Sequence, residues 1–107
     1  MRITLGLAAA GGLLVAPLTG GAATAYRQFR VTNDTARIVE CVLLVDGHTR
    51  TYLKVHPGKA YFDTFSEGRQ LQLACMRGKE GVYGPLKLGV DYRFVAAPSD
   101  RVDLAAN

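Results

Sequence analysis

Glycine residues recur at nearly regular intervals along most of the chain and divide it into short segments. Gly47, Gly58, Gly68, Gly78 and Gly89 follow one another at spacings of 10 or 11 residues. Several of them have turn-forming neighbours, as in the pairs Asp-Gly, Pro-Gly and Glu-Gly. Turn signals at this spacing are typical of an all-β sandwich or barrel, and no stretch after residue 26 shows helical periodicity over three turns.

The segments between these turns alternate in polarity as strands do. In segment 28–32, for example, Phe29 and Val31 share one face and the polar residues share the other. Such alternation, with β-branched and aromatic residues, predicts strands at 28–32, 37–45, 49–55, 60–65, 70–77, 90–96 and 102–104. We therefore expect an all-β fold, a small antiparallel β-sandwich of about six or seven short strands, immunoglobulin-like or of a related architecture.

Segment 37–45 differs from the others because it is apolar on both faces. Val39, Cys41 and Leu43 lie on one side of the expected strand, and Val42 and Leu44 lie on the other. A strand with this pattern is expected at the centre of a sheet that is covered on both sides.

The Asp46-Gly47 turn after this segment leaves two registers open. A two-residue turn, which the Asp-Gly pair favours, would place Val45 opposite His48. A three-residue loop would place Val45 opposite Thr49 and keep the apolar residues of both strands on one common face. Since a slip of one residue exchanges the two faces of a strand, we expect the second register.

The first 25 residues read as a secretory signal peptide. One positive charge at Arg2 precedes an apolar run from residue 3 to residue 18, and Ala23-Thr24-Ala25 is an A-x-A cleavage site. The uncharged stretch 3–26 is also long enough for a membrane anchor, but it is rich in Gly and Ala. We expect cleavage after Ala25, a periplasmic or secreted domain at 26–107, and membrane contact only through the leader before cleavage.

The two cysteines of the chain, Cys41 and Cys75, both fall in the expected domain and on apolar strand faces. An oxidising compartment allows such a pair to persist as a disulfide, and two cysteines permit one intramolecular connectivity. A metal site would need further ligands at short spacing, and the sequence contains no C-x-x-C or H-x-x-x-H pattern. We expect a disulfide, no metal site and no cofactor.

Catalytic groups are not assembled in any recognisable pattern. The only serines after residue 25, Ser66 and Ser99, lie in turn sequences without a nucleophile motif. His48 and His56 flank turns and read as solvated loop residues. We therefore expect a protein that is not an enzyme and has no catalytic residues, with a small envelope enzyme as the third choice of function.

Two surface features are candidates for binding. Arg50, Tyr52 and Lys54 form a basic and aromatic stripe, to which Arg30 could add from a neighbouring strand. The stripe could equally be an ordinary solvated sheet face, because exposed strands favour Tyr, Thr, Arg and Lys. Without residues 1–25 the net charge is +3, which is modest, and export removes the protein from most nucleic acid, so a nucleic-acid partner is not expected.

The second candidate is the glycine-rich stretch 78–85. It reads either as a mobile hairpin loop or as a binding loop that presents Lys79 and Tyr83. Asn33-Asp34-Thr35 matches the N-glycosylation pattern, but we interpret Asn33-Asp34 as a turn.

The expected function is a non-enzymatic binding module with a protein partner, as an accessory, chaperone-like or inhibitory subunit, using strand addition at an open edge. The alternative is a binder of envelope polyanions or anionic lipid through the basic stripe.

Overall fold

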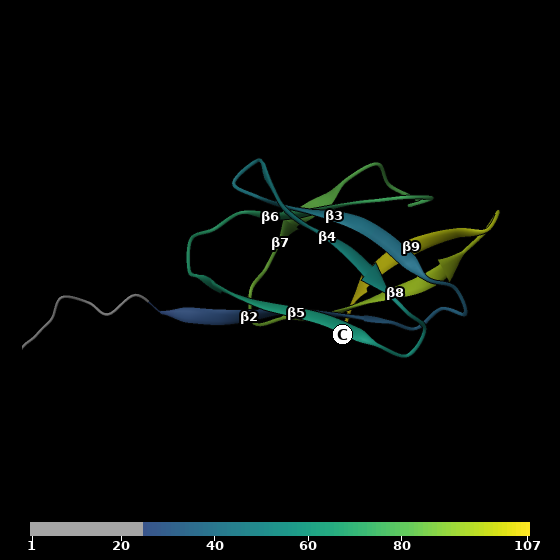
Figure 1. Ribbon diagram of the computed structural model, residues 1–107, viewed down its shortest axis with the longest axis horizontal. Coiled ribbons are helices and arrows are strands. Elements are labelled where there is room, and N and C mark those ends of the chain that lie inside the picture. The colour runs from purple at the N-terminus through teal and green to yellow at the C-terminus, as the bar shows by residue number, and fades with distance from the viewer. Residues whose placement is uncertain (1–24) are drawn as a thin grey trace, which may run out of the picture.

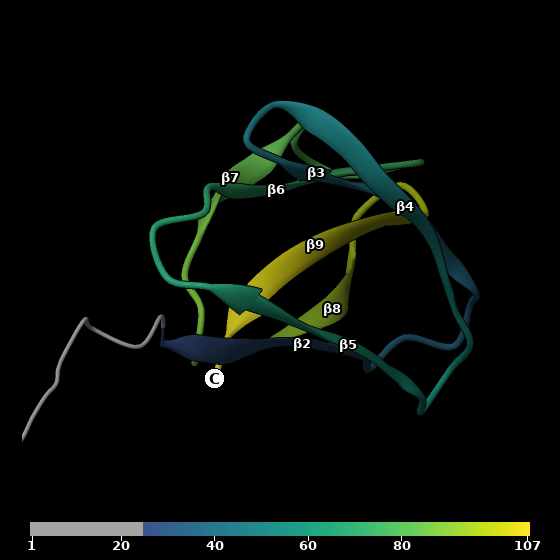
Figure 2. The ribbon, with the colours of Figure 1, turned by 60° about the vertical axis from the view of Figure 1, so that its left-hand side comes forward.

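The computed structural model describes residues 25–107, which form two β-sheets packed against each other (Figures 1 and 2). The strands, labelled as in Figure 1, are β2 (Tyr26–Asn33), β3 (Val39–Val45), β4 (His48–Val55), β5 (Ala60–Ser66), β6 (Leu71–Cys75), β7 (Tyr83–Leu86), β8 (Asp91–Ala97) and β9 (Arg101–Ala106). The predicted signal peptide lies outside the described residues except for Ala25.

Each sheet has four strands, in the orders β5-β2-β8-β9 and β4-β3-β6-β7. The sandwich-like all-β fold is confirmed, but the described residues contain eight strands rather than six or seven. The expectation of a fully antiparallel fold was wrong, because β2 and β8 are parallel. Between β2 and β8 the chain enters the other sheet twice, as β3–β4 and as β6–β7, with β5 in between, and such a long connection permits a parallel pair that a hairpin cannot make.

All seven expected strands are present, and β7 is the strand that the sequence pattern did not predict. It contains Gly84 and Pro85, which are depleted in strands. Gly84 has a φ of 145°, and a Cβ at this position would lie 2.8 Å from the carbonyl oxygen of Leu71. Glycine therefore permits the close approach of β7 to β6, so a residue that reads as loop-forming is required within this strand.

The β3–β4 hairpin combines both registers that the sequence left open. Cys41 lies opposite Leu53, as the apolar pattern predicts, but Val45 lies opposite His48 and not Thr49. A β-bulge after Leu43 accounts for the difference, because Leu43 pairs with Thr51 and the next residue pairs with Thr49. Arg50 is therefore the additional residue of the bulge.

The turn of this hairpin explains why a bulge is needed. Asp46 and Gly47 have φ values of 53° and 82°, and two positive values belong to the tight turn that Asp-Gly favours. The two-residue turn sets one register and the apolar faces set the other. One extra residue in β4 reconciles them.

The expectation that β3 is covered on both sides was wrong. One face contributes Val39, Cys41 and Leu43 to the core, whereas Val42 and Leu44 are only partly buried on the opposite face. Among residues 25–107 no third layer packs over that opposite face, because the described chain forms only two sheets.

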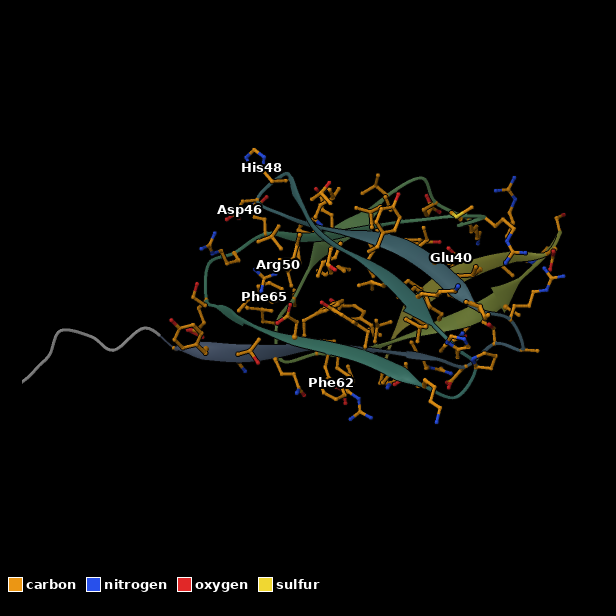
Figure 3. The ribbon with its side chains drawn as sticks, in the orientation of Figure 1. Glu40, Asp46, His48, Arg50, Phe62 and Phe65 are labelled. Carbon is orange, nitrogen blue, oxygen red and sulfur yellow. A yellow bond between two sulfur atoms is a disulfide. The ribbon has the colours of Figure 1, made fainter. Side chains whose placement is uncertain are left out.

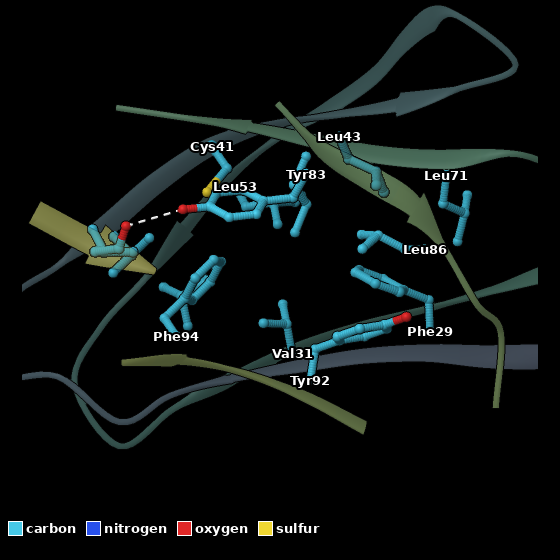
Figure 4. Packing of buried hydrophobic residues seen from close by; sticks show 14 of the residues in the cluster. Phe29, Val31, Cys41, Leu43, Leu53, Leu71, Tyr83, Leu86, Tyr92 and Phe94 are labelled. Atoms are coloured by element: carbon cyan, nitrogen blue, oxygen red, sulfur yellow. Dashed lines mark hydrogen bonds between the residues drawn. The ribbon is translucent and has the colours of Figure 1, made fainter. Parts of the chain in front are cut away.

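The core fills the space between the two sheets and draws on every strand (Figure 4). The ring of Phe29 lies 6.4 Å from that of Tyr61 and 6.1 Å from that of Tyr92, within the usual range for aromatic pairs. The buried hydrophobic residues are Phe29, Val31, Val39, Cys41, Leu43, Leu53, Val55, Phe65, Leu71, Leu73, Tyr83, Leu86, Tyr92, Phe94 and Val102.

The predicted disulfide between Cys41 and Cys75 is confirmed. The two residues face each other across β3 and β6, with Cα atoms 3.9 Å apart, so the bridge joins neighbouring strands of one sheet. It closes a loop with a sequence separation of 34 residues. A loop of this size corresponds to about 4 kcal/mol in the chain-entropy model, which is substantial for a domain with a thin core.

Asn33 ends β2 and organises the connection to β3. Its side chain is fully buried, and Nδ2 donates to the carbonyl oxygens of Arg37 (2.6 Å) and Val55 (2.8 Å). Its Oδ1 accepts hydrogen bonds from the backbone N–H and the hydroxyl of Thr35. The Asn33-Asp34 segment thus leads into a turn held by an asparagine side chain, and the amide nitrogen is not exposed to a glycosylating enzyme.

Candidate binding surfaces

The outer face of the sheet β4-β3-β6-β7 carries the most exposed aromatic side chain of the described residues. Tyr52 is 75% exposed and lies opposite Val42, which in turn lies opposite Ala74 of β6. Leu44, two residues further along β3, faces the same side. We call these four residues, Val42, Leu44, Tyr52 and Ala74, the outer face. The sequence showed that Val42 and Leu44 are apolar, but the interpretation that a second layer covers them left their exposure on the outer side of the sheet unpredicted.

Charged residues border the outer face at one end. Glu40 lies opposite Lys54 in the β3–β4 register, as the apolar pattern of the two strands requires, and both side chains are exposed. Met76, which follows β6 and is 63% exposed, donates its backbone N–H to the carbonyl oxygen of Glu40. An apolar centre with a polar border is the composition of many protein–protein interfaces.

The predicted stripe of Arg50, Tyr52 and Lys54 is not a continuous basic surface. Arg50 turns toward the other sheet, where its guanidinium carbon lies 5.3 Å from the ring centre of Phe65 (Figure 3). Its Nη2 is 3.4 Å from Oδ2 of Asp63. The expected contribution of Arg30 is also absent, because Arg30 lies in β2 of the opposite sheet.

The contact between β4 and β5 closes one side of the sandwich. Asp63 accepts a hydrogen bond of 3.1 Å from the hydroxyl of Tyr61 in addition to its ion pair with Arg50. Burial, together with the neighbouring Asp63 carboxylate, raises the pKa of Tyr61 to about 12. Charged residues that point inward at an edge disfavour the addition of another strand there.

A cleft of about 500 Å³ opens beside this contact, between the start of β4 and the end of β5. Asp46 in its wall accepts hydrogen bonds from the backbone N–H of Gln70 (2.9 Å) and from Nη1 of Arg69 (2.7 Å). Both hydrogen bonds lower the pKa of Asp46, and the bond from the backbone of Gln70 has the larger effect. Asp46 and Arg69 therefore satisfy each other, and their contact fixes the wall of the cleft.

The glycine-rich stretch is held against the sandwich. Tyr83 is only 8% exposed and lies within the core cluster (Figure 4). Its hydroxyl donates to the carbonyl oxygen of Val102 (3.1 Å) and accepts from the N–H of Glu80. Lys79 is exposed, but its backbone N–H also donates to Val102 and its Nζ lies 3.9 Å from Asp103. Tyr83 thus connects β7 to β9 across the two sheets and does not present its ring to a partner.

The remaining edges are also protected. The edge strand β7 contains Pro85, which lacks the N–H group that a partner strand would use. The edge strand β9 is partly occupied by a parallel bridge between Gly78 and Val102. Since β4 carries a bulge and β5 an inward-facing carboxylate, the structure weighs against strand addition as the mode of binding.

Groups suited to catalysis or metal binding are sparse in this part of the chain. His48 and His56 are exposed, and no cluster of three His, Cys, Asp or Glu side chains that could hold a metal ion occurs within residues 25–107. The same residues contain no helix with the length and hydropathy needed to cross a membrane.

Comparisons of the chain with family models, with curated proteins and with solved structures find no match.

Proposed function

We propose that this protein is an exported, non-enzymatic module that binds another protein through its outer face. The export part rests on the leader pattern in residues 1–25, which predicts release of the domain after Ala25 into the periplasm or the medium. The Cys41–Cys75 disulfide supports it, because such bonds persist in oxidising compartments. An accessory, chaperone-like or inhibitory subunit would fit this description.

The exposure of Tyr52 over an apolar sheet face carries the proposal. Tyr52 is 75% exposed, whereas Val42 and Leu44 beside it are partly buried and lie on the side away from the core. Contiguous exposed apolar surface on a small soluble domain marks a contact site, and tyrosine is among the residues that most often dominate binding energy.

The geometry favours a partner that packs on the sheet face over one that adds a strand. Arg50 of β4 and Asp63 of β5 form an ion pair where these two edge strands meet. This ion pair would have to break before a partner strand could pair with either edge. A face-packing partner leaves these contacts intact. Glu40 and Lys54 at the border would then contribute specificity more than affinity, since exposed charges at a rim are worth little.

The alternative of a polyanion bound on the basic stripe loses support from the position of Arg50. Its charge is compensated by Asp63, so Lys54 remains the main basic group beside Tyr52. Binding that is held by one lysine would be weak, and salt would weaken it further by screening. A complex that survives high salt concentration would favour the protein partner.

An immunoglobulin-like relationship of the sandwich belongs to the same proposal. Two packed sheets and a disulfide on core-side strand positions support it. The bridge within one sheet and the parallel pair of β2 and β8 depart from the immunoglobulin pattern, in which the disulfide joins the two sheets.

Phe62 supplies a matched control for the experiment. It is an exposed aromatic residue (60%) on β5, in the other sheet, and points away from the sandwich in Figure 3. A photoreactive amino acid placed at position 52 or at position 62 of the exported protein should give a specific adduct from position 52 only. With the partner identified, Tyr52→Ser should weaken its binding at least tenfold, whereas Phe62→Ser should change it less than twofold. Equal effects of the two substitutions would contradict the proposal.

A further inference from the structure

Three arginines from distant parts of the sequence meet at one cleft. Arg37 precedes β3, Arg77 follows β6, and Arg101 begins β9, and together with Asp100 they line a cleft of about 260 Å³. We call these three residues the arginine cluster. The other residues that line the cleft are Thr35, three alanines and Val102. No pattern in the sequence connects them, because the fold alone brings their positions together.

One carboxylate serves two of the three arginines in the cluster. Oδ2 of Asp100 lies 2.6 Å from Nη1 of Arg37 and 3.2 Å from Nη1 of Arg77, so both guanidinium groups use the same oxygen. Arg101 donates to the carbonyl oxygen of Gly78 at 3.2 Å. Each guanidinium group has five N–H donors, so these contacts occupy only a minority of the donors that the cluster offers.

The backbone holds the cluster in place. Arg77 and Asp100 have φ values of 57° and 59°, a conformation that is uncommon outside glycine. The carbonyl oxygen of Arg77 accepts a hydrogen bond of 3.0 Å from the N–H of Val102, which fixes it to β9. A ligand would therefore meet arginines whose attachment points are already arranged, and this arrangement lowers the cost of ordering them.

We propose that the arginine cluster binds a phosphate group, either as a free anion or as part of a lipid headgroup. Arginine forks match the oxygens of phosphate, and three positive charges against one carboxylate leave an excess positive charge that suits an anionic phosphate group. The Asp100 carboxylate holds the cluster together when it is empty and competes with the ligand for the same donors. None of the outer-face residues lines this cleft, so the proposal does not depend on the protein-binding role.

The competition by Asp100 gives the proposal a distinctive test. Titration of the folded protein with inorganic phosphate, followed by calorimetry or amide chemical shifts, should show one site. Asp100→Asn should tighten this binding at least threefold, because the competing charge is removed while asparagine tolerates a positive φ. Arg37→Gln and Arg101→Gln should each weaken it about tenfold, the effect of one hydrogen bond to a charged group.

Arg30→Gln is the matched control, since it removes the same charge from the outer side of β2 and should leave phosphate binding unchanged. Thermal melts of each variant establish that it is folded. Phosphate binding that is the same in Arg37→Gln as in Arg30→Gln would overturn the proposal. So would tighter binding of acetate than of phosphate, because the site would then prefer carboxylates.

Vesicles distinguish the two sources of phosphate. Phosphatidylcholine vesicles with added phosphatidylglycerol should retain the wild-type protein and release Arg37→Gln if the ligand is a lipid headgroup. Binding of inorganic phosphate without retention on the vesicles would assign the site to a free anion. A failure to bind either probe would refute phosphate recognition, and it would leave capture through Tyr52 unaffected.

Discussion

The guanidinium group of Arg50 lies over the ring of Phe65, 5.3 Å from its centre, and joins the edge strands of the two sheets. A bulge in β4 creates this contact, because the extra residue turns its side chain toward the other sheet. The same arginine reaches Asp63 of β5 at 3.4 Å. Arg50, which the sequence pattern places in an exposed stripe, therefore links the two sheets along one side of the sandwich.

Arg50→Gln should lower the free energy of unfolding by about 1 kcal/mol. Cation–π contacts and ion pairs at exposed positions each contribute less than about 1 kcal/mol, and the substitution removes both. Urea unfolding measures the change, with Arg30→Gln as a control for the loss of charge alone. A larger effect of the control substitution would show that the contact with Phe65 is not what stabilises this edge.

Asn33→Ala should be among the most destabilising single substitutions at a polar position, at roughly 3 kcal/mol. It leaves the buried carbonyl oxygen of Val55 without the donor that Asn33 supplies, and it removes one of the two donors to the carbonyl oxygen of Arg37, which also lies 3.0 Å from the Thr35 hydroxyl. Asp34→Ala, at the exposed neighbouring position, should cost little. Denaturant unfolding measures the free energy of unfolding of both variants. Similar values would mean that water replaces the hydrogen bonds that the Asn33 side chain makes.

Removal of the disulfide should lower the melting temperature by roughly 10 °C or more. The Cys41→Ser, Cys75→Ser double variant loses about 3 to 4 kcal/mol through the greater freedom of its unfolded chain. Met76→Ser, next to Cys75 but exposed, provides a comparison that keeps the bridge. Calorimetric scans under non-reducing conditions measure both variants. An unchanged melting temperature in the double variant would show that the bridge does not reduce the freedom of the unfolded chain as the chain-entropy model assumes.

Stability should decline in alkaline solution between pH 10 and about pH 12. Burial and the Asp63 carboxylate raise the pKa of Tyr61 to about 12 in the folded protein, above the ordinary tyrosine value of 10.0. The folded state therefore binds more protons than the unfolded state in this window, and the contribution of Tyr61 is lost as the pH rises. Tyr61→Phe should flatten the fall in unfolding free energy over this range. The slope will not vanish, since burial also raises the pKa of Tyr83. Identical slopes in the variant and the wild type would contradict this assignment.

Much of the fold follows from local sequence pattern, as the β3–β4 hairpin illustrates. Alternation sets Cys41 opposite Leu53, and Asp46-Gly47 sets the tight turn, and both features are present. The sequence shows that the alternation and the tight turn require different registers, but it does not show that a bulge in β4 reconciles them. A bulge at Arg50 is one of several ways to absorb one residue, and the selection depends on Phe65 and Asp63 in the other sheet.

Features that depend on distant residues were beyond the sequence pattern. The strand β7 forms because Gly84 allows close approach to β6, which no local propensity indicates. The apolar side of β3 was recognised, but whether Val42 and Leu44 are covered depends on how many layers the fold has. Tyr83 looked like an exposed loop residue because its partner, Val102, is remote in sequence.

The leader provides the last prediction. Cleavage after Ala25 would make Tyr26 the first residue, and the carbonyl oxygen of Ala25, which accepts from the N–H of Glu67 at 3.0 Å, would leave with the peptide. The pairing of Tyr26 with Ser66 and the rest of the β2–β5 ladder would remain, so the shortened protein should keep its fold. Intact-mass analysis of the exported protein should find Tyr26 at the N-terminus. Replacing Ala23 and Ala25 by Leu should block this processing and leave the precursor membrane-bound, because signal peptidases require small residues at these positions. Exported protein that retains residues 1–25 without such substitutions would favour the membrane anchor.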